Sequence, residues 1–293
     1  MEARRYIIIT PVRNEEAHLR ETIKSVAAQT IRPVRWIIVD DGSDDSTGQI
    51  ADEAAKMFDW IRVVHRADRG FRRSGGGVVE TFYDGYKLVE NEPWDFLAKL
   101  DGDLSFAPDY FEKCFRQFEA DPKLGIGGGE ICMKLAGAVQ VESKGDPAFH
   151  VRGATKIYRR DCWKAIGGLL RETGWDTYDE VKANMLGWKT RTFDGLQIVH
   201  HRETGGADGT WKNWVKNGRA NYIVGYHPLF MFLKCVRRLF ERPYVIVSAG
   251  LWYGFVTGYF SRDSRHQEPE VIRYLRREQM RRMMFQSSIW AEK

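Results

Sequence analysis

Two aspartates one residue apart, Asp101 and Asp103, directly follow the apolar run at residues 97–100. An unpaired carboxylate at the end of a buried strand is costly unless a cation or a donor meets it. Carboxylates at positions i and i+2 of a strand point the same way, and paired hard oxygen ligands suit Mg²⁺ or Mn²⁺. Such an ion stabilises a departing diphosphate. The alternative is a polar β-turn with Gly102 at its bend.

A second acidic cluster lies in the stretch VDDGSDDST at residues 39–47, where a strand is expected to end and a helix to begin near Ser46 or Thr47. Acidic groups at this edge of a nucleotide-binding sheet accept hydrogen bonds from the nucleoside. Asp40 or Asp41 is therefore a candidate to contact a ribose hydroxyl or the imide N–H of uracil. An ordinary capped βα turn explains the same residues without any ligand.

The third candidate is Asp176, in the stretch ETGWDTYDEVKANMLGWKT at residues 172–190. We expect Asp176 to begin a helix, with Asp179 and Glu180 one turn further on. A carboxylate fixed near a reacting carbon can act as general base for a hydroxyl nucleophile. Acidic residues are also favourable in the first turn of any helix, because they face the positive end of its dipole.

The elements that must position these carboxylates alternate along the first hundred residues. Apolar strands are expected at 6–10, 34–40, 61–65 and 94–101, separated by amphipathic helices. This alternation indicates a mostly parallel sheet with helices on both faces, and ligands bind beyond the carboxyl ends of such strands. The sequence has neither a GxGxxG after the first strand nor a GxxxxGK[ST], which disfavours a dinucleotide-binding fold and a P-loop.

Composition places these elements in an ordinary α/β protein of 293 residues with a net charge of +5. Residues 227–293 carry 12 Lys and Arg against 6 Asp and Glu, whereas residues 1–226 carry 33 against 34. We expect a catalytic domain at 1–226 and a basic helical appendage at 227–293. Cys114, Cys132, Cys162 and Cys235 lack metal-ligand spacing and are expected to be buried thiols of a cytosolic protein. The apolar run at 6–10 is too short for a signal peptide.

The order of TPVRNEE, VDDGSDDST, KLDGD and GWDTYDEVKANMLGW resembles glycosyltransferase family 2, the inverting, metal-dependent nucleotide-sugar enzymes with the GT-A fold. The resemblance extends from about Tyr6 to His201. It implies a Rossmann-like nucleotide-sugar domain that binds Mn²⁺ or Mg²⁺. Asp101 and Asp103 match the DXD element of the family, in which the second aspartate is the usual direct metal ligand. Asp176 matches the catalytic base, eleven residues before Gly187.

The resemblance also implies roles for residues around these motifs. Arg72 or Arg73 would contact the diphosphate, and His200 or His201 would contribute a metal ligand or a diphosphate contact, although a structural His-His-Arg loop explains the pair equally well. Trp175 replaces the usual glutamate before the base and would give the acceptor pocket an aromatic wall. The residues expected to line the nucleoside pocket are Pro11, Arg13, Glu15 and Asp40 or Asp41.

The appendage contains 19 uncharged residues at 243–261, slightly short of the ~20 that span a bilayer. Gly250, Gly254 and Gly258 recur at every fourth position, as on helix faces that pack closely. Aromatic side chains and flanking arginines favour a membrane interface with anionic lipid. A full span and a buried core helix are the alternatives. We expect a cytoplasmic protein peripheral on the inner face of the membrane, with no nucleic-acid partner.

The predicted function is transfer of a sugar, with inversion, from a nucleoside-diphosphate donor to a hydroxyl of a saccharide or lipid-linked acceptor, in surface polysaccharide synthesis. A UDP-sugar is slightly preferred over GDP and dTDP donors. A non-catalytic nucleotide-binding scaffold is one rival. A sugar nucleotidyltransferase is another, but it should carry a glycine-rich, Lys- or Arg-bearing loop after the first strand, where this chain has TPVRNEE.

Overall fold

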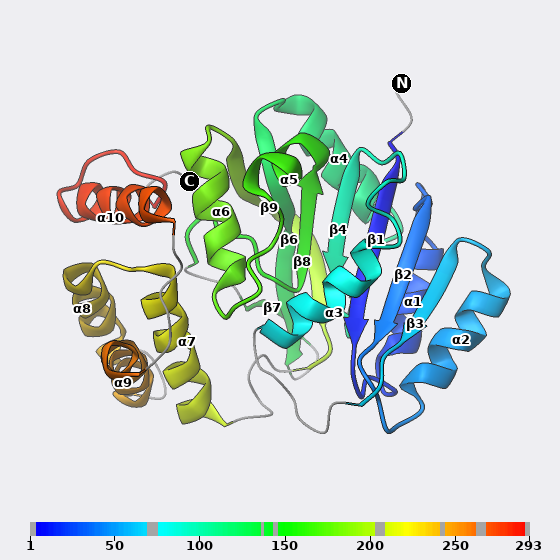
Figure 1. The fold of residues 1–293 in the computed structure, drawn as a ribbon, viewed down its shortest axis with the longest axis horizontal. Helices are drawn as coiled ribbons and strands as arrows, with labels where there is room; N and C mark the ends of the chain where they lie inside the picture. Colours follow the sequence, from blue (N-terminus) through cyan, green and yellow to red (C-terminus); the bar gives the residue numbers. More distant parts are fainter. Residues whose placement is uncertain are drawn as a thin grey trace.

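The computed structural model describes residues 4–68, 76–135, 138–142, 146–202, 209–240, 244–261 and 268–290. Within these ranges one sheet has the strand order β3-β2-β1-β4-β8-β6-β9-β5, with β7 paired to β6 (Figure 1). Its strands are β1 (Tyr6–Val12), β2 (Arg35–Asp40), β3 (Ile61–His65), β4 (Phe96–Leu100), β5 (Leu104–Phe106), β6 (Leu124–Leu135), β7 (Ala138–Val141), β8 (Thr155–Arg159) and β9 (Lys189–His200).

The first four strands are parallel, as the alternation of strand and helix predicted. Their β-branched side chains alternate between two cores, so Ile8 packs on one face of the sheet and Ile7 and Ile9 on the other. The one face is covered by α1 (Leu19–Ala27), α2 (Thr47–Met57) and α4 (Tyr110–Ala120), and the other by α3 (Gly76–Tyr86), α5 (Arg160–Ile166) and α6 (Trp175–Met185). The expected mixed α/β fold with helices on both faces is confirmed.

The second half of the sheet is mixed and brings distant segments to the edge where β4 ends. Strand β8 is antiparallel to β4, and β5 is antiparallel to β9, so that Leu104 lies opposite His200. Gly102 separates the two aspartates where β4 passes close to β1. A Cβ atom at this position would lie 2.6 Å from Val12 Cγ1. The bend between Asp101 and Asp103 therefore requires glycine.

Beyond the sheet lies a cluster of helices that α6 borders on one side (Figure 1). It contains α7 (Thr210–Val224), α8 (Pro228–Arg237), the 3₁₀ turn η2 (Arg238–Phe240), α9 (Ile246–Phe260) and α10 (Pro269–Met283). The expected boundary between residues 226 and 227 falls between α7 and α8, although α7 packs along α9 in this cluster. That division of the chain into domains stays a prediction.

The glycine stripe of α9 is used inside the chain. Gly250, Gly254 and Gly258 face α7, where Gly254 lies against Val215 and Gly258 against Tyr222. The helix therefore buries one face against α7, as a core helix would, and leaves its other face exposed. Among the residues described, no helix has the length and hydropathy needed to cross a bilayer. All four cysteines are free and buried, as predicted.

Candidate active site

The acidic pair lies beyond the end of β4, and its two members have different surroundings. Asp101 accepts a hydrogen bond from Lys99, a buried lysine of β4. Asp103 is 6% exposed, and its Oδ2 atom lies 3.2 Å from His200 Nε2. Its other carboxylate oxygen, Oδ1, is buried and has no hydrogen-bond partner among the described residues. An unpartnered buried carboxylate oxygen is an unusual feature that calls for an additional ligand.

The two adjacent histidines at the end of β9 point to opposite sides of the strand. His200 lies between carboxylates of Asp103 and Glu142, with its Nδ1 atom 3.6 Å from Glu142 Oε2. Burial opposes the charged imidazolium, yet the contacts with these two carboxylates raise the pKa of His200 to about 10. His201 contacts Ser105 at 2.9 Å and stacks on His18. His200 is therefore the histidine that adjoins the acidic pair.

Burial raises the pKa of Asp103, but the hydrogen bond from His200 and the nearby Arg202 outweigh it and hold the pKa below its usual range. Arg202 Nε lies 4.0 Å from Asp103 Oδ2, and Arg202 Nη2 lies 2.6 Å from Glu15 Oε2. Glu15 follows β1 and also neighbours Gly102. The loops after β1, β4 and β9 thus meet at one place, and Arg202 is a cation there that the sequence analysis did not single out.

The candidate nucleoside pocket lies at the ends of β1 and β2. Both carboxylate oxygens of Asp40 already have partners within the protein. Its Oδ1 atom accepts hydrogen bonds from Ser43 in the turn after β2, and its Oδ2 atom lies 3.1 Å from Nδ1 of His65 in β3. Asp41 forms an ion pair with Arg66 at 2.6 Å and accepts a hydrogen bond at its carbonyl from Arg13. Asp41 is therefore better placed than Asp40 to face a ligand.

Pro11 lies in β1, opposite Val39 of β2. Two hydrogen bonds join the loop after β1 to the loop after β2. Asn14 N–H donates to Ser43 Oγ, and Asp44 N–H donates to Asn14 Oδ1. Arg66, the partner of Asp41, was not anticipated, because its role depends on the register of β3 beside β2. Arg72 and Arg73 lie outside the described residues.

Asp176 lies in the first turn of α6, as expected, after the N-cap Gly174 at φ 91°. Its carboxylate is half-buried, and Gly153 is its neighbour across the sheet edge. A Cβ atom on Gly153 would lie 3.4 Å from Asp176 Cβ. Asp101 N donates to the carbonyl of the next residue, Ala154, at 2.9 Å. The segment 153–154 therefore contacts both the acidic pair and the candidate base.

Trp175 is 6% exposed and belongs to the core on the α3, α5 and α6 face. The ammonium groups of Lys99 and Lys156 each lie 5.5 Å from the centre of its ring. These cation–π contacts cover the ring that was expected to stack on an acceptor sugar. The placement argues against an aromatic wall and indicates that Trp175 packs between the strand of Asp101 and the helix of Asp176.

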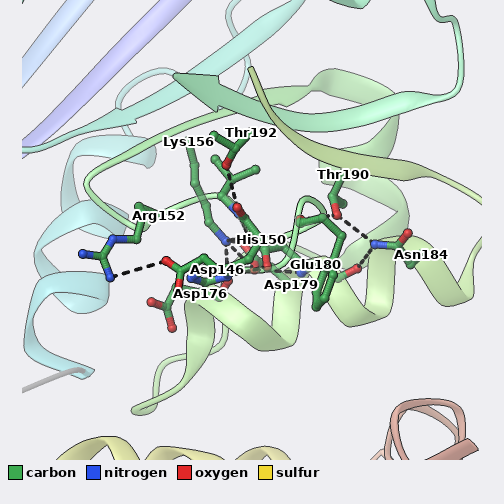
Figure 2. Close-up of polar contacts among 12 residues, drawn as sticks. Asp146, His150, Arg152, Lys156, Asp176, Asp179, Glu180, Asn184, Thr190 and Thr192 are labelled. Atoms are coloured by element: carbon green, nitrogen blue, oxygen red, sulfur yellow. Dashed lines mark hydrogen bonds and ion pairs between the residues drawn. The ribbon is translucent and has the colours of Figure 1, made fainter. Parts of the chain in front are cut away.

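Next to Asp176 lies a second polar cluster, which we call the buried cluster: His150, Lys156, Tyr158, Asp179 and Glu180. Figure 2 shows its four ionisable members His150, Lys156, Asp179 and Glu180 beside Asp176. Lys156 Nζ lies 2.9 Å from Asp179 Oδ1 and 2.7 Å from Glu180 Oε1, and it also donates to the backbone carbonyl of Asp176. The Lys156, Asp179 and Glu180 side chains are inaccessible to solvent.

The buried cluster shifts the acidity of its members. Burial raises the pKa of Asp179 to about 7, although Lys156 opposes the shift. Burial lowers the pKa of Lys156, but the two carboxylates outweigh this effect and raise it above its usual value. His150 Nδ1 lies 2.9 Å from Glu180 Oε2, and its pKa is raised in the same way against burial. These ion pairs hold the first turn of α6, and with it Asp176, against β8.

Among the described residues, no three His, Cys, Asp or Glu side chains are arranged to hold a metal ion by themselves. The residues present still fit a Mg²⁺ or Mn²⁺ site that substrate completes. Such ions are often bound by one or two carboxylates plus phosphate oxygens and water. Asp103 offers a buried, unpartnered oxygen, and His200 lies beside it. Asp101 faces the same edge from its contact with Lys99.

Residues 7–130 match the family model described as Glycosyl transferase family 2. A Bacillus subtilis protein named Uncharacterized glycosyltransferase EpsJ is 37% identical over 122 residues, which are 42% of this chain and 33% of that protein. The Glucosyl-dolichyl phosphate glucuronosyltransferase of Haloferax volcanii is 27% identical over 202 residues, 62% of this chain and 61% of its own. The chain thus matches between a third and three fifths of these relatives.

Among solved structures, the mannosyltransferase PcManGT of Pyrobaculum calidifontis, in complex with GDP-Man and Mn²⁺, has a TM-score of 0.55 at 17% identity. The match covers 97% of this chain and 76% of that one. This likeness confirms the GT-A arrangement of sheet and helices. The family match places the segment 7–130 in glycosyltransferase family 2, as the resemblance of its motifs implied.

Proposed function

We propose that this chain is an inverting, divalent-metal-dependent glycosyltransferase that moves a sugar from a nucleoside-diphosphate donor to a hydroxyl of a saccharide or lipid-linked acceptor. The observation that carries the proposal is the buried, unpartnered Oδ1 atom of Asp103 at the carboxyl edge of a family 2 sheet. Relatives named as glycosyltransferases support the reaction class. Surface polysaccharide synthesis is the process that we expect it to serve.

In this proposal the donor lies across the ends of β1, β2 and β4. Asp41, with Arg13 and Arg66 beside it, contacts the nucleoside. Asp103 and His200 would hold the metal, whose positive charge would stabilise the diphosphate as a leaving group. Arg202, 4.0 Å from Asp103, adds a positive charge at the same place. A UDP-sugar remains our slight preference, and the GDP-Man complex of PcManGT keeps a GDP-sugar as the main alternative.

Asp176 acts as the general base on the other side of segment 153–154. It takes the proton of the acceptor hydroxyl while that oxygen attacks the anomeric carbon. The C–O bond to the diphosphate breaks as the new glycosidic bond forms, and the electron pair leaves with the diphosphate. One displacement inverts the anomeric configuration. Lys156, bound to the Asp176 carbonyl, keeps the base in place.

The first test is titration calorimetry of UDP, GDP, dTDP and ADP, each with and without Mn²⁺. We expect one nucleotide to bind tightly only with the metal. Asp176→Asn should then keep this binding and lose transfer by about 10²- to 10⁴-fold, the usual contribution of a general base. Glu172→Gln, four residues earlier in the loop that precedes α6, is the matched control. Transfer by Asp176→Asn at the wild-type rate would refute the base assignment, and absence of all nucleotide binding would favour a scaffold.

We also propose that the exposed faces of α8 and α9 dock on an anionic membrane that presents the acceptor. We call these residues the apolar docking face: Leu229, Phe232, Leu233, Val236, Phe240, Tyr244, Val245, Ile246, Trp252, Tyr253, Tyr259 and Phe260. Phe240 and Phe260 are 82% and 85% exposed, and the rings of Phe232 and Trp252, 5.9 Å apart, join the two helices. Apolar surface of this extent on one part of a molecule marks an interaction site.

Charge complementarity favours lipid as the occupant of the apolar docking face. The exposed Arg237 lies at the end of α8, and exposed Arg273 and Arg277 lie on α10, in the part of the chain with the basic excess. Co-sedimentation with phosphatidylglycerol vesicles tests this. Phe260→Ser should weaken binding several-fold, and Met57→Ser, which changes a 67% exposed apolar residue on α2, should not. Equal binding by wild type and Phe260→Ser would refute membrane docking through this face.

A further inference from the structure

Glu142 occupies a position beside the proposed metal site that no motif of the sequence indicated. It directly follows β7, and its backbone N–H donates to Ile131 O of β6 at 2.9 Å. Arg152 Nη2 lies 2.9 Å from Glu142 Oε1. Glu142 is therefore held through its backbone N–H and through one carboxylate oxygen, and only 17% of its side chain is exposed.

The second oxygen of Glu142 faces His200 from the side opposite Asp103. Glu142 Oε2 lies 3.6 Å from His200 Nδ1, and Asp103 Oδ2 lies 3.2 Å from His200 Nε2. The imidazole is thus held between two carboxylates with 11% of its side chain exposed. A histidine that binds a metal through one ring nitrogen usually donates the other N–H to a carboxylate, which fixes the tautomer and the orientation of the ring.

We propose that Glu142 is a positioning residue for the metal site. Its Oε2 atom faces His200 Nδ1 at 3.6 Å in an ion pair, and with the metal bound it would accept the Nδ1–H and leave Nε2 to face the ion beside Asp103. Arg152 in turn keeps the Glu142 carboxylate aimed at the imidazole. This inference rests on the metal role proposed above for Asp103 and His200. It adds a residue from a segment that lies between the family motifs and belongs to none of them.

The test measures Mn²⁺ affinity of the full chain by calorimetry, in the presence of saturating UDP or the nucleoside diphosphate that the wild type binds. Glu142→Ala should weaken Mn²⁺ binding by about 10- to 100-fold, the usual cost of losing such a carboxylate. Nucleotide binding without metal should stay unchanged, and the variant should remain folded, with a melting temperature lowered by a few degrees through the lost ion pairs with Arg152 and His200. Pulsed EPR of the bound Mn²⁺ gives a second readout, in which coupling to an imidazole nitrogen is expected in wild type and is lost or weakened in Glu142→Ala.

Asp146→Ala is the matched control, because Asp146 shares Arg152 as a neighbour at 3.8 Å and has no ion pair with His200. Equal weakening by both variants would show that the effect passes through Arg152 alone and would overturn the assignment of Glu142. Unchanged Mn²⁺ affinity in Glu142→Ala would overturn it as well. Failure of the wild type itself to bind Mn²⁺ with any nucleotide would instead refute the metal site of the proposed function, and the inference with it.

Discussion

Two clusters of charge lie at the two sides of segment 153–154, and they satisfy their carboxylates in opposite ways. In the buried cluster, Asp179 and Glu180 are fully covered, and each has Lys156 as a close partner. At the sheet edge, Asp103 is nearly as buried, but one of its oxygens has no partner among the described residues. A satisfied buried ion network stabilises one backbone arrangement, whereas an unsatisfied buried oxygen is ready for a ligand.

Removal of the cation of the buried cluster should have the largest effect on stability. Lys156→Met leaves the buried Asp179 and Glu180 without their ammonium partner, and we expect a loss of about 3 to 5 kcal/mol in the free energy of unfolding. Urea denaturation followed by circular dichroism measures it. Lys99→Met is the matched control and should cost clearly less, because its partner Asp101 keeps 31% of its side chain exposed and can be hydrated. Equal losses would contradict the distinction between the clusters.

The pH dependence of stability tests the sheet edge. The pKa of His200 is raised from its usual value of 6.5 to about 10 in the folded chain, so its stabilising charge is fully present below about pH 6.5 and is lost as the pH rises through 10. The melting temperature of the metal-free protein should therefore fall by several degrees over this window. His200→Gln should flatten that part of the profile, and an unchanged slope would exclude His200 as its cause.

Tyr158→Phe removes a single neutral donor from the buried cluster. The phenol donates to Asp179 Oδ2 at 2.5 Å, and loss of one such bond should lower the free energy of unfolding by about 1 to 2 kcal/mol. Chemical denaturation measures the change. Tyr83→Phe loses hydrogen bonds with both the carbonyl and the N–H of Leu169, but at a partly exposed site where water can replace them, and it should cost less. The reverse order would contradict the greater weight given to the hydrogen bond within the ion network.

The smallest effect on stability is expected from the residue with the largest proposed role in binding. Asp103→Ala loses the contact with His200 but also removes a buried, unpartnered oxygen, so the free energy of unfolding should change by no more than about 1 kcal/mol. Metal-dependent nucleotide binding should disappear in the calorimetric titration. If Asp103→Ala unfolds readily, or still shows metal-dependent nucleotide binding, then Asp103 does not differ from the buried cluster in serving binding more than stability.

The sequence by itself determined the parallel strands, the helices between them, the two acidic clusters after strand ends and the helix whose first turn holds Asp176. These features follow from local periodicity and turn chemistry, which involve residues close in the chain. The order of the four family motifs along the chain also indicated the fold class. The apolar character of residues 243–261 was also evident, although the face of α9 that is buried was not.

Only the tertiary structure decided which charges meet. His200 and Asp103 are 97 positions apart in the sequence. The register of β9 beside β5 brings the side chain of His200, and not that of His201, to the carboxylate of Asp103. No sequence pattern singled out Lys99 and Lys156, and only the packing of β4, β8 and α6 brings both ammonium groups to the ring of Trp175. The physical reason is that strand register and helix packing select partners across the whole chain, whereas sequence patterns report only each residue's immediate neighbours.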